Sequence, residues 1–453
     1  MEQSDMADSR SFYQLDKWIK EKIGDNQGEF FSLHKLREYQ IGKIRDTISY
    51  AKANSIFYQR KYEHVNPEDI IDFTDLSIIP FTTEEDIINN GTRLVCVNQK
   101  HIHRIVTLNT SGTMGESKRI FFTEEDQELT KDYFHHGMQT INGSGDRVLI
   151  LMPGERPGSV GDLLLTALGR FNCQGIPYGQ VDDYDQVLNM IFTQKINGIV
   201  GIPIQVYRLA RLKKHKYPEV KTEIKSILLS SDYASSSLIK AIKSAFQCEV
   251  FDHYGMTEMG LGGGLECHEH NGYHLREADM YFEIIDPDTE KVVPDGVYGE
   301  FVFTTLTRKG MPLIRYRTGD YSRFIDRPCS CGTKLKTLEN ISFRLKKRIF
   351  LNQEVLTINL LDDLLFNHDR LLDYEAVLTK EKHKNRLTIF ASFYEKVNAE
   401  DFDQLNKILM NSKIIAKLIN EGELLIEFAP ADQKTFDYPI VGKRNIRLTK
   451  IKG

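Results

Sequence analysis

The middle of the chain alternates short apolar runs with amphipathic stretches, a pattern that few folds accommodate. The apolar runs lie at 147–152, 199–202 and 226–230, and each is followed by proline, glycine or polar residues. The amphipathic stretches lie at 184–196, 205–214 and 235–246. Apolar strands that are joined by helices are typical of a largely parallel sheet with helices on its faces. The sequence therefore predicts the α/β fold class.

Different patterns flank this region, and a chain of 453 residues is long for a single core. Apolar residues at helical spacing predict a helical cap at about 10–90. Beyond Gly255, strand-like runs follow one another through turns without a helical crossover, which predicts a small β subdomain at about 265–340. We therefore expect a large N-terminal domain of several subdomains at 1–343, with mixed and parallel sheets. A small α+β domain at 344–453 should follow it.

The charge balance argues against two classes of partner. The chain has 59 Lys and Arg against 64 Asp and Glu, a net charge of −5, and offers no overall positive field for nucleic acid or an anionic membrane. No stretch approaches the roughly 18 apolar residues that span a bilayer. The polar first residues do not predict an export signal. We therefore expect a cytoplasmic protein without membrane insertion, whose six cysteines stay reduced.

The segment 110–118 interleaves hydroxyl side chains with glycines between two strand-like runs. Backbone N–H groups and hydroxyls of such a loop can converge on phosphate oxygens, and Lys118 adds positive charge. The fixed spacing of a Walker A loop is absent, and a strand follows, so a P-loop ATPase is disfavoured. An ordinary Ser/Thr/Gly hairpin is the structural alternative. The candidate phosphate contacts are Thr110, Ser111, Gly112, Thr113, Gly115 and Lys118.

Two further turns carry residues that suit a nucleotide. The turn at 252–260 follows a strand and offers an aromatic ring, a tight glycine turn, a hydroxyl and a carboxylate that could bind Mg²⁺. These residues are Tyr254, Gly255, Thr257 and Glu258. Asp320 ends a strand and could accept both ribose hydroxyls, although such an aspartate is usually an ordinary turn residue. The three motifs together favour a site for ATP and Mg²⁺.

A second group of candidate ligands consists of cysteines and histidines in or beside the predicted β subdomain. Turns of the chain could bring two or more thiolates and an imidazole together, and these ligands suit a tetrahedral structural Zn²⁺. The candidate ligands are Cys267, His274, Cys329 and Cys331, and His268 and His270 compete with His274 for the place of the nitrogen ligand. Reduced surface cysteines beside a solvated run of histidines are the alternative.

In this order, the three motifs resemble the adenylate-forming superfamily of acyl-CoA synthetases, peptide-synthetase adenylation domains and luciferases. The segments 50–58, 76–86 and 266–274 resemble its phenylacetate-CoA ligase branch, in which similar Cys and His positions recur. The resemblance runs from about residue 40 to the C-terminus. It implies ATP-dependent activation of a small-molecule carboxylic acid as acyl-AMP, release of pyrophosphate, and transfer of the acyl group to a thiol, most often coenzyme A.

For the nucleotide, the resemblance implies contacts along the whole site. Residues 110–118 would form the phosphate loop, and Ser231 and Asp232 would lie on the adenine side. Tyr254 would stack on adenine, and Asp320 would hold the ribose.

For catalysis, the resemblance implies that Thr257 contacts the α-phosphate and that Glu258 binds Mg²⁺. Lys443 would bridge the substrate carboxylate and the α-phosphate, and Arg344 would contact ribose or phosphate. The C-terminal domain would be a mobile lid that rotates at about 344–347, withdraws Lys443 and admits the acceptor thiol.

Several alternatives stay open at this point. The acceptor could instead be a carrier-protein thiol, an enzyme cysteine or an amine. Because Lys346 and Lys347 replace the acidic residues usual at the family's hinge, a nucleotide-binding protein without turnover is the alternative from another class. Aryl or arylacetic acids are favoured by the resemblance. The acyl pocket is expected to be lined by the helix around 134–138, by the segment 175–179, and by residues from 230–233 through Gly260. A homodimer is also left open.

Overall fold

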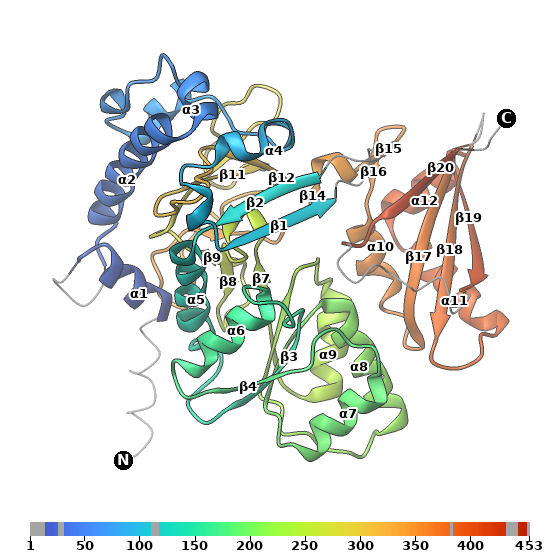
Figure 1. The fold of residues 1–453 in the computed structure, drawn as a ribbon. Coiled ribbons are helices and arrows are strands. Elements are labelled where there is room, and N and C mark those ends of the chain that lie inside the picture. Colours follow the sequence, from blue (N-terminus) through green and yellow to red (C-terminus); the bar gives the residue numbers. More distant parts are fainter. Residues whose placement is uncertain (1–13, 26–30, 110–116, 381–383, 432–442, 451–453) are drawn as a thin grey trace. The chain divides into compact units, whose positions relative to one another are not determined.

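The computed structural model describes residues 14–25, 31–109, 117–380, 384–431 and 443–450 (Figure 1). The chain divides into a first unit of residues 1–145, 153–175 and 253–342 and a second unit of 146–152, 176–252 and 343–453. The junction between Ser342 and Phe343 lies one residue from the predicted domain boundary. Beyond it, the C-terminal residues form one compact unit with 176–252. Their assignment to a mobile lid stays a prediction.

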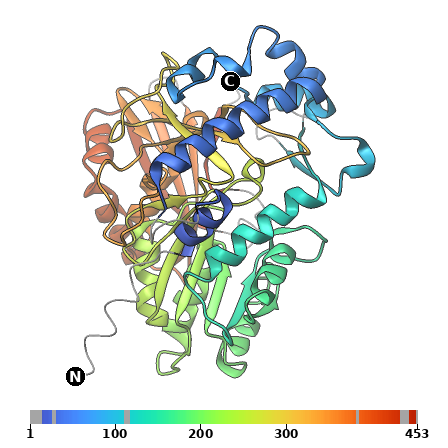
Figure 2. The same ribbon diagram turned by 90° about the vertical axis from the view of Figure 1, so that its left-hand side faces the viewer.

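Capping residues set where the helices of the first unit begin. The Ser32 hydroxyl accepts the Lys35 N–H at the start of α2 (Leu33–Asn54), the long blue helix in Figure 2. Thr123 and Asp126 form a capping box at the start of α5 (Glu124–Met138). The other helices are α1 (Gln14–Lys22), α3 (Ile56–Lys61), α4 (Glu84–Asn90) and α6 (Val160–Gly169). The 3₁₀ turns are η2 (Pro67–Asp69), η3 (Phe73–Ile78), η4 (Gly91–Leu94), η5 (Gln99–His101) and η6 (Thr257–Met259).

The strands of the first unit are antiparallel. β1 (Arg104–Asn109) pairs with β2 (Ser117–Phe122), so the ends of both strands adjoin the predicted phosphate loop. β10 (Met280–Ile285), β11 (Gly299–Thr305) and β12 (Tyr316–Ser322) form a meander. β8 (Gly264–Glu266), β9 (Tyr273–Leu275) and β13 (Thr337–Leu338) form a second group of paired strands. The strands expected without helical crossovers after Gly255 are therefore present.

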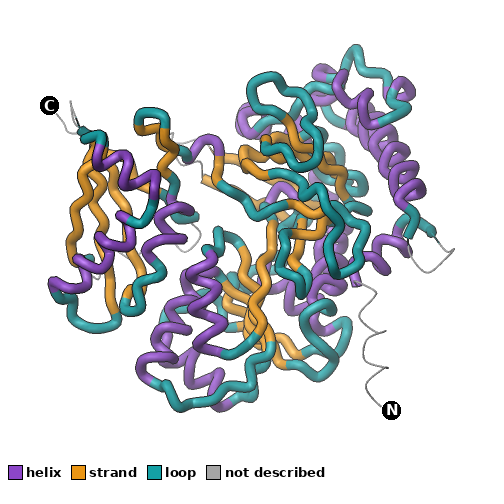
Figure 3. The backbone as a smooth tube through the Cα atoms, turned by 180° about the vertical axis from the view of Figure 1, so that it is seen from behind, coloured by secondary structure: helices purple, strands orange, loops and turns teal. Residues whose placement is uncertain are grey.

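The second unit contains the predicted parallel sheet, which confirms the α/β fold class. β3 (Arg147–Leu151), β5 (Gly198–Gly201) and β6 (Ser226–Ser230) are parallel neighbours. β4 (Gln174–Pro177) and β7 (Glu249–Tyr254) flank them and carry the chain across the unit boundaries. In Figure 3 the connecting helices lie against these strands. They are α7 (Tyr184–Thr193), α8 (Pro203–Lys216) and α9 (Ser236–Phe246).

The C-terminal part of the second unit is α+β. Its sheet has the order β19-β18-β17-β20, in which β17 and β18 are antiparallel and the two outer pairs are parallel. These strands are β17 (Leu371–Lys380), β18 (Asn385–Phe393), β19 (Leu424–Pro430) and β20 (Ile446–Lys450). The remaining elements are β14 (Phe343–Arg344), η7 (Leu345–Lys347), β15 (Ile349–Leu351), β16 (Glu354–Leu356), α10 (Ile358–Leu365), α11 (Ala399–Met410) and α12 (Lys413–Asn420).

Each unit has its own hydrophobic core. In the second unit, one cluster of buried side chains joins residues of the parallel sheet, such as Leu149 and Ile227, to C-terminal residues such as Leu361 and Ile389. In the first unit the core is rich in aromatic rings, and Phe282 and Phe301 stack with centroids 5.3 Å apart. None of the helices that the structure describes combines the length and the apolar character that a membrane span requires.

Candidate functional site

Lys118 and Glu258 form an ion pair inside the first unit. Lys118 lies on β2 next to the predicted phosphate loop, and Glu258 lies in η6 directly after β7. The side chains are 10% and 3% exposed, so both charges are largely removed from water. Burial lowers the pKa of Lys118, but the carboxylates of Glu258 and Glu84 outweigh it, and the net shift is upward. Lys118 is therefore held in its charged form.

Three further side chains hold this ion pair in place. Glu84, at the start of α4, accepts a second bond from Lys118 Nζ at 2.9 Å. The Tyr316 hydroxyl donates to Glu258 Oε1 at 3.2 Å. The Arg308 guanidinium donates to the carbonyl oxygen of Glu258 at 2.7 Å and so holds η6 in position. Sequence reasoning missed the contact of Glu84, although it lies in the segment 76–86 that carries the family resemblance.

Tyr254 and Asp320 also meet in the first unit. The Tyr254 hydroxyl donates to Asp320 Oδ2 at 2.7 Å, and the backbone N–H of Asp320 donates to the Thr318 hydroxyl at 3.0 Å. Both Tyr254 and Asp320 are buried. Gly255 follows Tyr254 because a Cβ there would lie 2.1 Å from the carbonyl oxygen of Leu261. The glycine thus fixes the turn that joins the aromatic ring of Tyr254 to η6.

His253 lies beside the aromatic face of α5. Its ring centroid is 6.2 Å from that of Tyr133 and 6.3 Å from that of Phe134. A Cβ at Gly262 would lie 2.4 Å from the Tyr133 ring and 3.3 Å from His253 Nε2, so only glycine leaves this approach open. Burial lowers the pKa of His253 to about 4. His253 is therefore neutral at pH 7, and sequence reasoning did not single it out.

Four other predicted site residues lie in the second unit. Ser231 and Asp232 follow β6, Arg344 lies in β14, and Lys443 is exposed just before β20. Asp232 Oδ2 accepts the backbone N–H of Arg444 at 3.0 Å. Thr257 lies in η6 with Glu258, in the first unit. The predicted contacts Thr110, Ser111, Gly112, Thr113 and Gly115 lie outside the described residues.

Four side chains with metal-binding atoms converge in the first unit. Atoms of Cys267, His274, Cys329 and Cys331 lie within 4.8 Å of one another. The sulfur atoms of Cys267 and Cys329 are 3.7 Å apart, and Cys331 Sγ is 3.4 Å from His274 Nε2. The Thr337 hydroxyl lies 3.1 Å from His274 Nδ1, which leaves Nε2 facing the cysteines. Of the three competing histidines, His274 belongs to this cluster.

Comparison with known proteins supplies independent findings. The sequence model of the AMP-binding enzyme family matches residues 47–306. A phenylacetate-coenzyme A ligase of Aromatoleum evansii is 25% identical over 377 residues, which are 81% of this chain and 84% of that protein. One from Pseudomonas putida is 28% identical over 313 residues, 66% of this chain and 68% of that protein.

The fold is also shared with a solved structure. A 2-hydroxyisobutyryl-CoA ligase in the postadenylation state, in complex with R3-HIB-AMP, superimposes with a TM-score of 0.77. The match covers 92% of this chain and 90% of that chain at 18% sequence identity. At this identity the similarity concerns the fold.

The buried, neutral His253 predicts an acid-induced loss of stability. Its pKa is about 4 in the folded protein and about 6.5 in an unfolded chain. The unfolded chain therefore binds the proton first, and stability that is present above pH 6.5 is lost as the pH falls toward 4. The difference corresponds to about 3 kcal/mol.

Urea unfolding between pH 7 and pH 4 tests this prediction. The His253→Asn variant should be less sensitive to acid than the wild type over this range. His64→Asn, which changes an exposed histidine, is the matched control and should keep the wild-type pH dependence. Equal pH dependence in the wild type and His253→Asn would contradict the prediction.

Proposed function

The chain belongs to the AMP-binding enzyme family, and we propose that it is an AMP-forming acid–CoA ligase. The family resemblance that the motifs predicted is confirmed by the match over residues 47–306. The proposed reaction joins a carboxylic acid to AMP, releases pyrophosphate, and transfers the acyl group to the thiol of coenzyme A. The similarity to phenylacetate-CoA ligases over most of the chain supports this assignment.

The observation that carries the proposal is the buried Lys118–Glu258 ion pair. Glu258 would hold Mg²⁺ in place of the Lys118 ammonium group when ATP is bound, because carboxylate oxygens are ligands that this ion prefers. When bound, Mg²⁺ would neutralise the charge of the phosphates and make pyrophosphate a better leaving group. Lys118 lies on the strand that leaves the phosphate loop. It would turn from Glu258 to the phosphates when ATP arrives.

Tyr254 and Asp320 would hold the nucleoside. Asp320 Oδ2 accepts the hydroxyl of Tyr254, and this bond would orient the carboxylate for contact with the ribose hydroxyls. The ring of Tyr254 would lie against adenine. Thr257, one residue before Glu258, would donate its hydroxyl to the α-phosphate. These groups position the nucleotide, and positioning with charge neutralisation is the main contribution that an enzyme makes to transfer at phosphorus.

We further propose that the acyl group lies against the face of α5 that carries Tyr133 and Phe134. The neighbouring His253 is neutral at pH 7 and brings no charge to this region. Apolar and aromatic surroundings favour an uncharged acyl group, such as that of an aryl or arylacetic acid. The place of action proposed from the sequence is the cytoplasm.

Lys443 would bridge the substrate carboxylate and the α-phosphate during adenylation. We predict that the wild type releases AMP and pyrophosphate when given ATP, Mg²⁺, coenzyme A and an aromatic acid. Lys443→Ala should lower carboxylate-dependent pyrophosphate release by about 100-fold or more, because negative charge that builds up at the α-phosphorus would lose its counter-charge.

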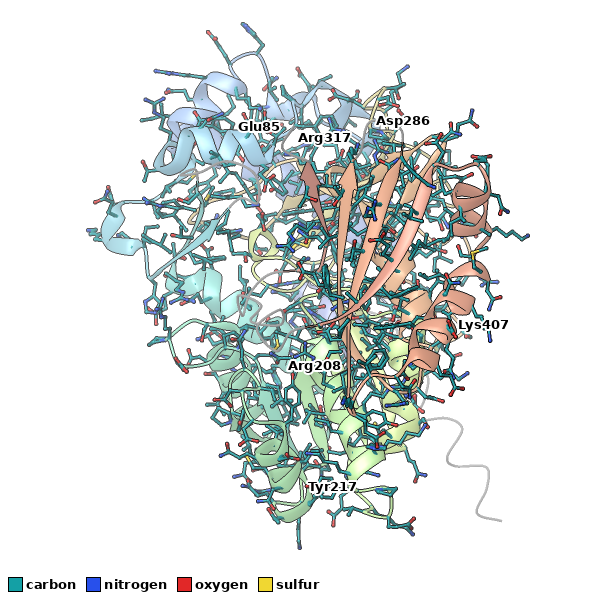
Figure 4. All side chains as sticks on the ribbon, turned by 90° about the vertical axis from the view of Figure 1, so that its right-hand side faces the viewer. Glu85, Arg208, Tyr217, Asp286, Arg317 and Lys407 are labelled. Carbon is teal, nitrogen blue, oxygen red and sulfur yellow. The ribbon has the colours of Figure 1, made fainter. Side chains whose placement is uncertain are left out.

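A pyrophosphate-release assay measures this effect. Lys407→Ala, an exposed lysine of α11 labelled in Figure 4, is the matched control and should keep the wild-type rate. Near-normal adenylation by Lys443→Ala would remove the proposed role of Lys443. AMP release that does not depend on coenzyme A, with an acylated carrier protein or amine as product, would instead favour another acceptor.

We also propose that Cys267, His274, Cys329 and Cys331 hold a structural Zn²⁺. In a tetrahedral site with Zn–S bonds of about 2.3 Å, two sulfur atoms lie about 3.8 Å apart, close to the observed 3.7 Å between Cys267 and Cys329. The bond between Thr337 and His274 Nδ1 orients the imidazole as the partners of metal-bound histidines usually do. Four protein ligands would close the tetrahedral site and leave no open position for a substrate, so the ion would be structural.

The zinc proposal predicts one equivalent of Zn²⁺ in the purified protein, measured by plasma mass spectrometry. Cys329→Ser should lower the zinc content well below one equivalent and lower the melting temperature. Cys96→Ser changes a buried cysteine outside the cluster and should keep the metal. Full zinc content in Cys329→Ser, or none in the wild type, would contradict the proposal.

A further inference from the structure

Arg444, the residue after Lys443, is anchored by two buried carboxylates of the second unit. Its guanidinium donates to Asp362 Oδ1 from Nη2 at 3.0 Å and from Nε at 3.2 Å, and it forms a second ion pair with Asp373. The side chains of Arg444, Asp362 and Asp373 are 9%, 3% and 1% exposed. Arg208 of α8, labelled in Figure 4, pairs with the other oxygen of Asp373.

Carboxylates of opposite charge surround the Arg444 guanidinium and keep it in place. Burial raises the pKa of Asp373, but Arg444 and Arg208 outweigh it, and the net shift is downward. Burial raises the pKa of Asp362 to about 6, although Arg444 and the Tyr374 hydroxyl act against it. Removing an arginine from such a cluster would leave buried carboxylates unpaired, and that costs several kcal/mol in order of magnitude. The side chain of Arg444 therefore holds residue 444 against α10 and β17.

The backbone of Arg444 is held by a different residue. Its N–H donates to Asp232 Oδ2 at 3.0 Å, while Asp232 Oδ1 accepts the N–H of Tyr233 at 2.9 Å. Both oxygens of Asp232 thus accept backbone N–H groups. The same turn is tied to α10, because the Tyr233 hydroxyl donates to Asp363 Oδ2 at 2.8 Å. The turn after β6 and the segment that carries Lys443 are therefore joined at residue 444.

The chain beyond Arg444 is fixed as well. β20 begins at Ile446, which lies opposite Ala376 of β17 in a parallel pair. The position of Lys443 is therefore set by the anchored side chain of Arg444, by the strand two residues further on, and by the bond from Arg444 N–H to Asp232. Of these three restraints, the bond to Asp232 acts at the peptide group that Lys443 shares with Arg444. It therefore restrains the peptide plane next to the Cα atom of Lys443.

We propose that Asp232 is a positioning residue for adenylation, which holds Lys443 in place through the backbone N–H of Arg444. The proposal rests on the adenylating role of Lys443 proposed above. A carboxylate that accepts an N–H bond is a strong acceptor, and its loss would remove the restraint that acts directly on the 443–444 peptide. Because Asp232 lies in the turn proposed for the adenine side, the same turn would bind nucleotide and set the place of the lysine. Nucleotide binding and lysine placement would thus be coupled through one side chain.

A double-mutant cycle tests the proposal, with pyrophosphate release as the readout. Asp232→Ala should lower the kcat of adenylation about 10-fold or more when Lys443 is present. In the Lys443→Ala background, the same change should lower the residual rate less than about twofold, since the residue that Asp232 positions is gone. Asp232→Asn retains an oxygen acceptor and should recover part of the rate.

The matched control is Asp363→Asn, which loosens the same turn at Tyr233 without contacting Arg444. It should lower kcat less than about twofold, and circular dichroism of each variant should show the wild-type fold. Equal losses from Asp232→Ala in both backgrounds, or a rise in KM for ATP without a fall in kcat, would mean that Asp232 acts on the nucleotide and would overturn the proposal. A wild-type rate in Asp232→Ala would do the same.

The Lys443→Ala variant separates this proposal from the one on which it rests. Normal adenylation in Lys443→Ala would remove the proposed role of the lysine. If Lys443→Ala is defective in adenylation and Asp232→Ala adenylates at the wild-type rate, only the proposed positioning role of Asp232 is removed.

Discussion

The buried ion pair between Lys118 and Glu258 is the interaction on which the proposed chemistry depends. Each charge would destabilise the core if it were buried alone, so the two residues hold β2 and η6 against each other. Tyr316 and Arg308 add bonds to the same turn from the β12 side. If Lys118 turned to the phosphates of ATP, Glu258 would hold Mg²⁺ in its place, and neither side chain would be left as an unpaired buried charge. Binding of ATP and metal would then be coupled by charge balance.

The residues proposed for one reaction are divided between the two units. Lys118, Glu258, Tyr254 and Asp320 belong to the first unit, and Asp232 and Lys443 belong to the second. Within each unit, buried contacts fix the chain at these residues. The Tyr254 hydroxyl orients the Asp320 carboxylate, and the ion pair of Arg444 with Asp362 anchors the chain one residue after Lys443.

The sequence predicted the parts of the fold that local patterns specify. Apolar runs of strand length predicted β3, β5 and β6, because a buried parallel strand needs apolar residues on both faces. The three thiols and the imidazole that converge near β9 were also predicted by residue type. Glu84, His253 and the Arg444 cluster were not, since a charged or aromatic residue has many acceptable partners. Which one it meets depends on how distant segments pack, and spacing does not show that.

The dependence of ATP binding on Mg²⁺ tests the central claim most directly. Titration calorimetry would measure the Kd of ATP with Mg²⁺ and with EDTA, in the wild type and in Glu258→Gln. If Glu258 exchanges Lys118 for the metal, Mg²⁺ should tighten binding about 10-fold or more in the wild type and less than about twofold in the variant. An undiminished effect of Mg²⁺ in Glu258→Gln would contradict the claim.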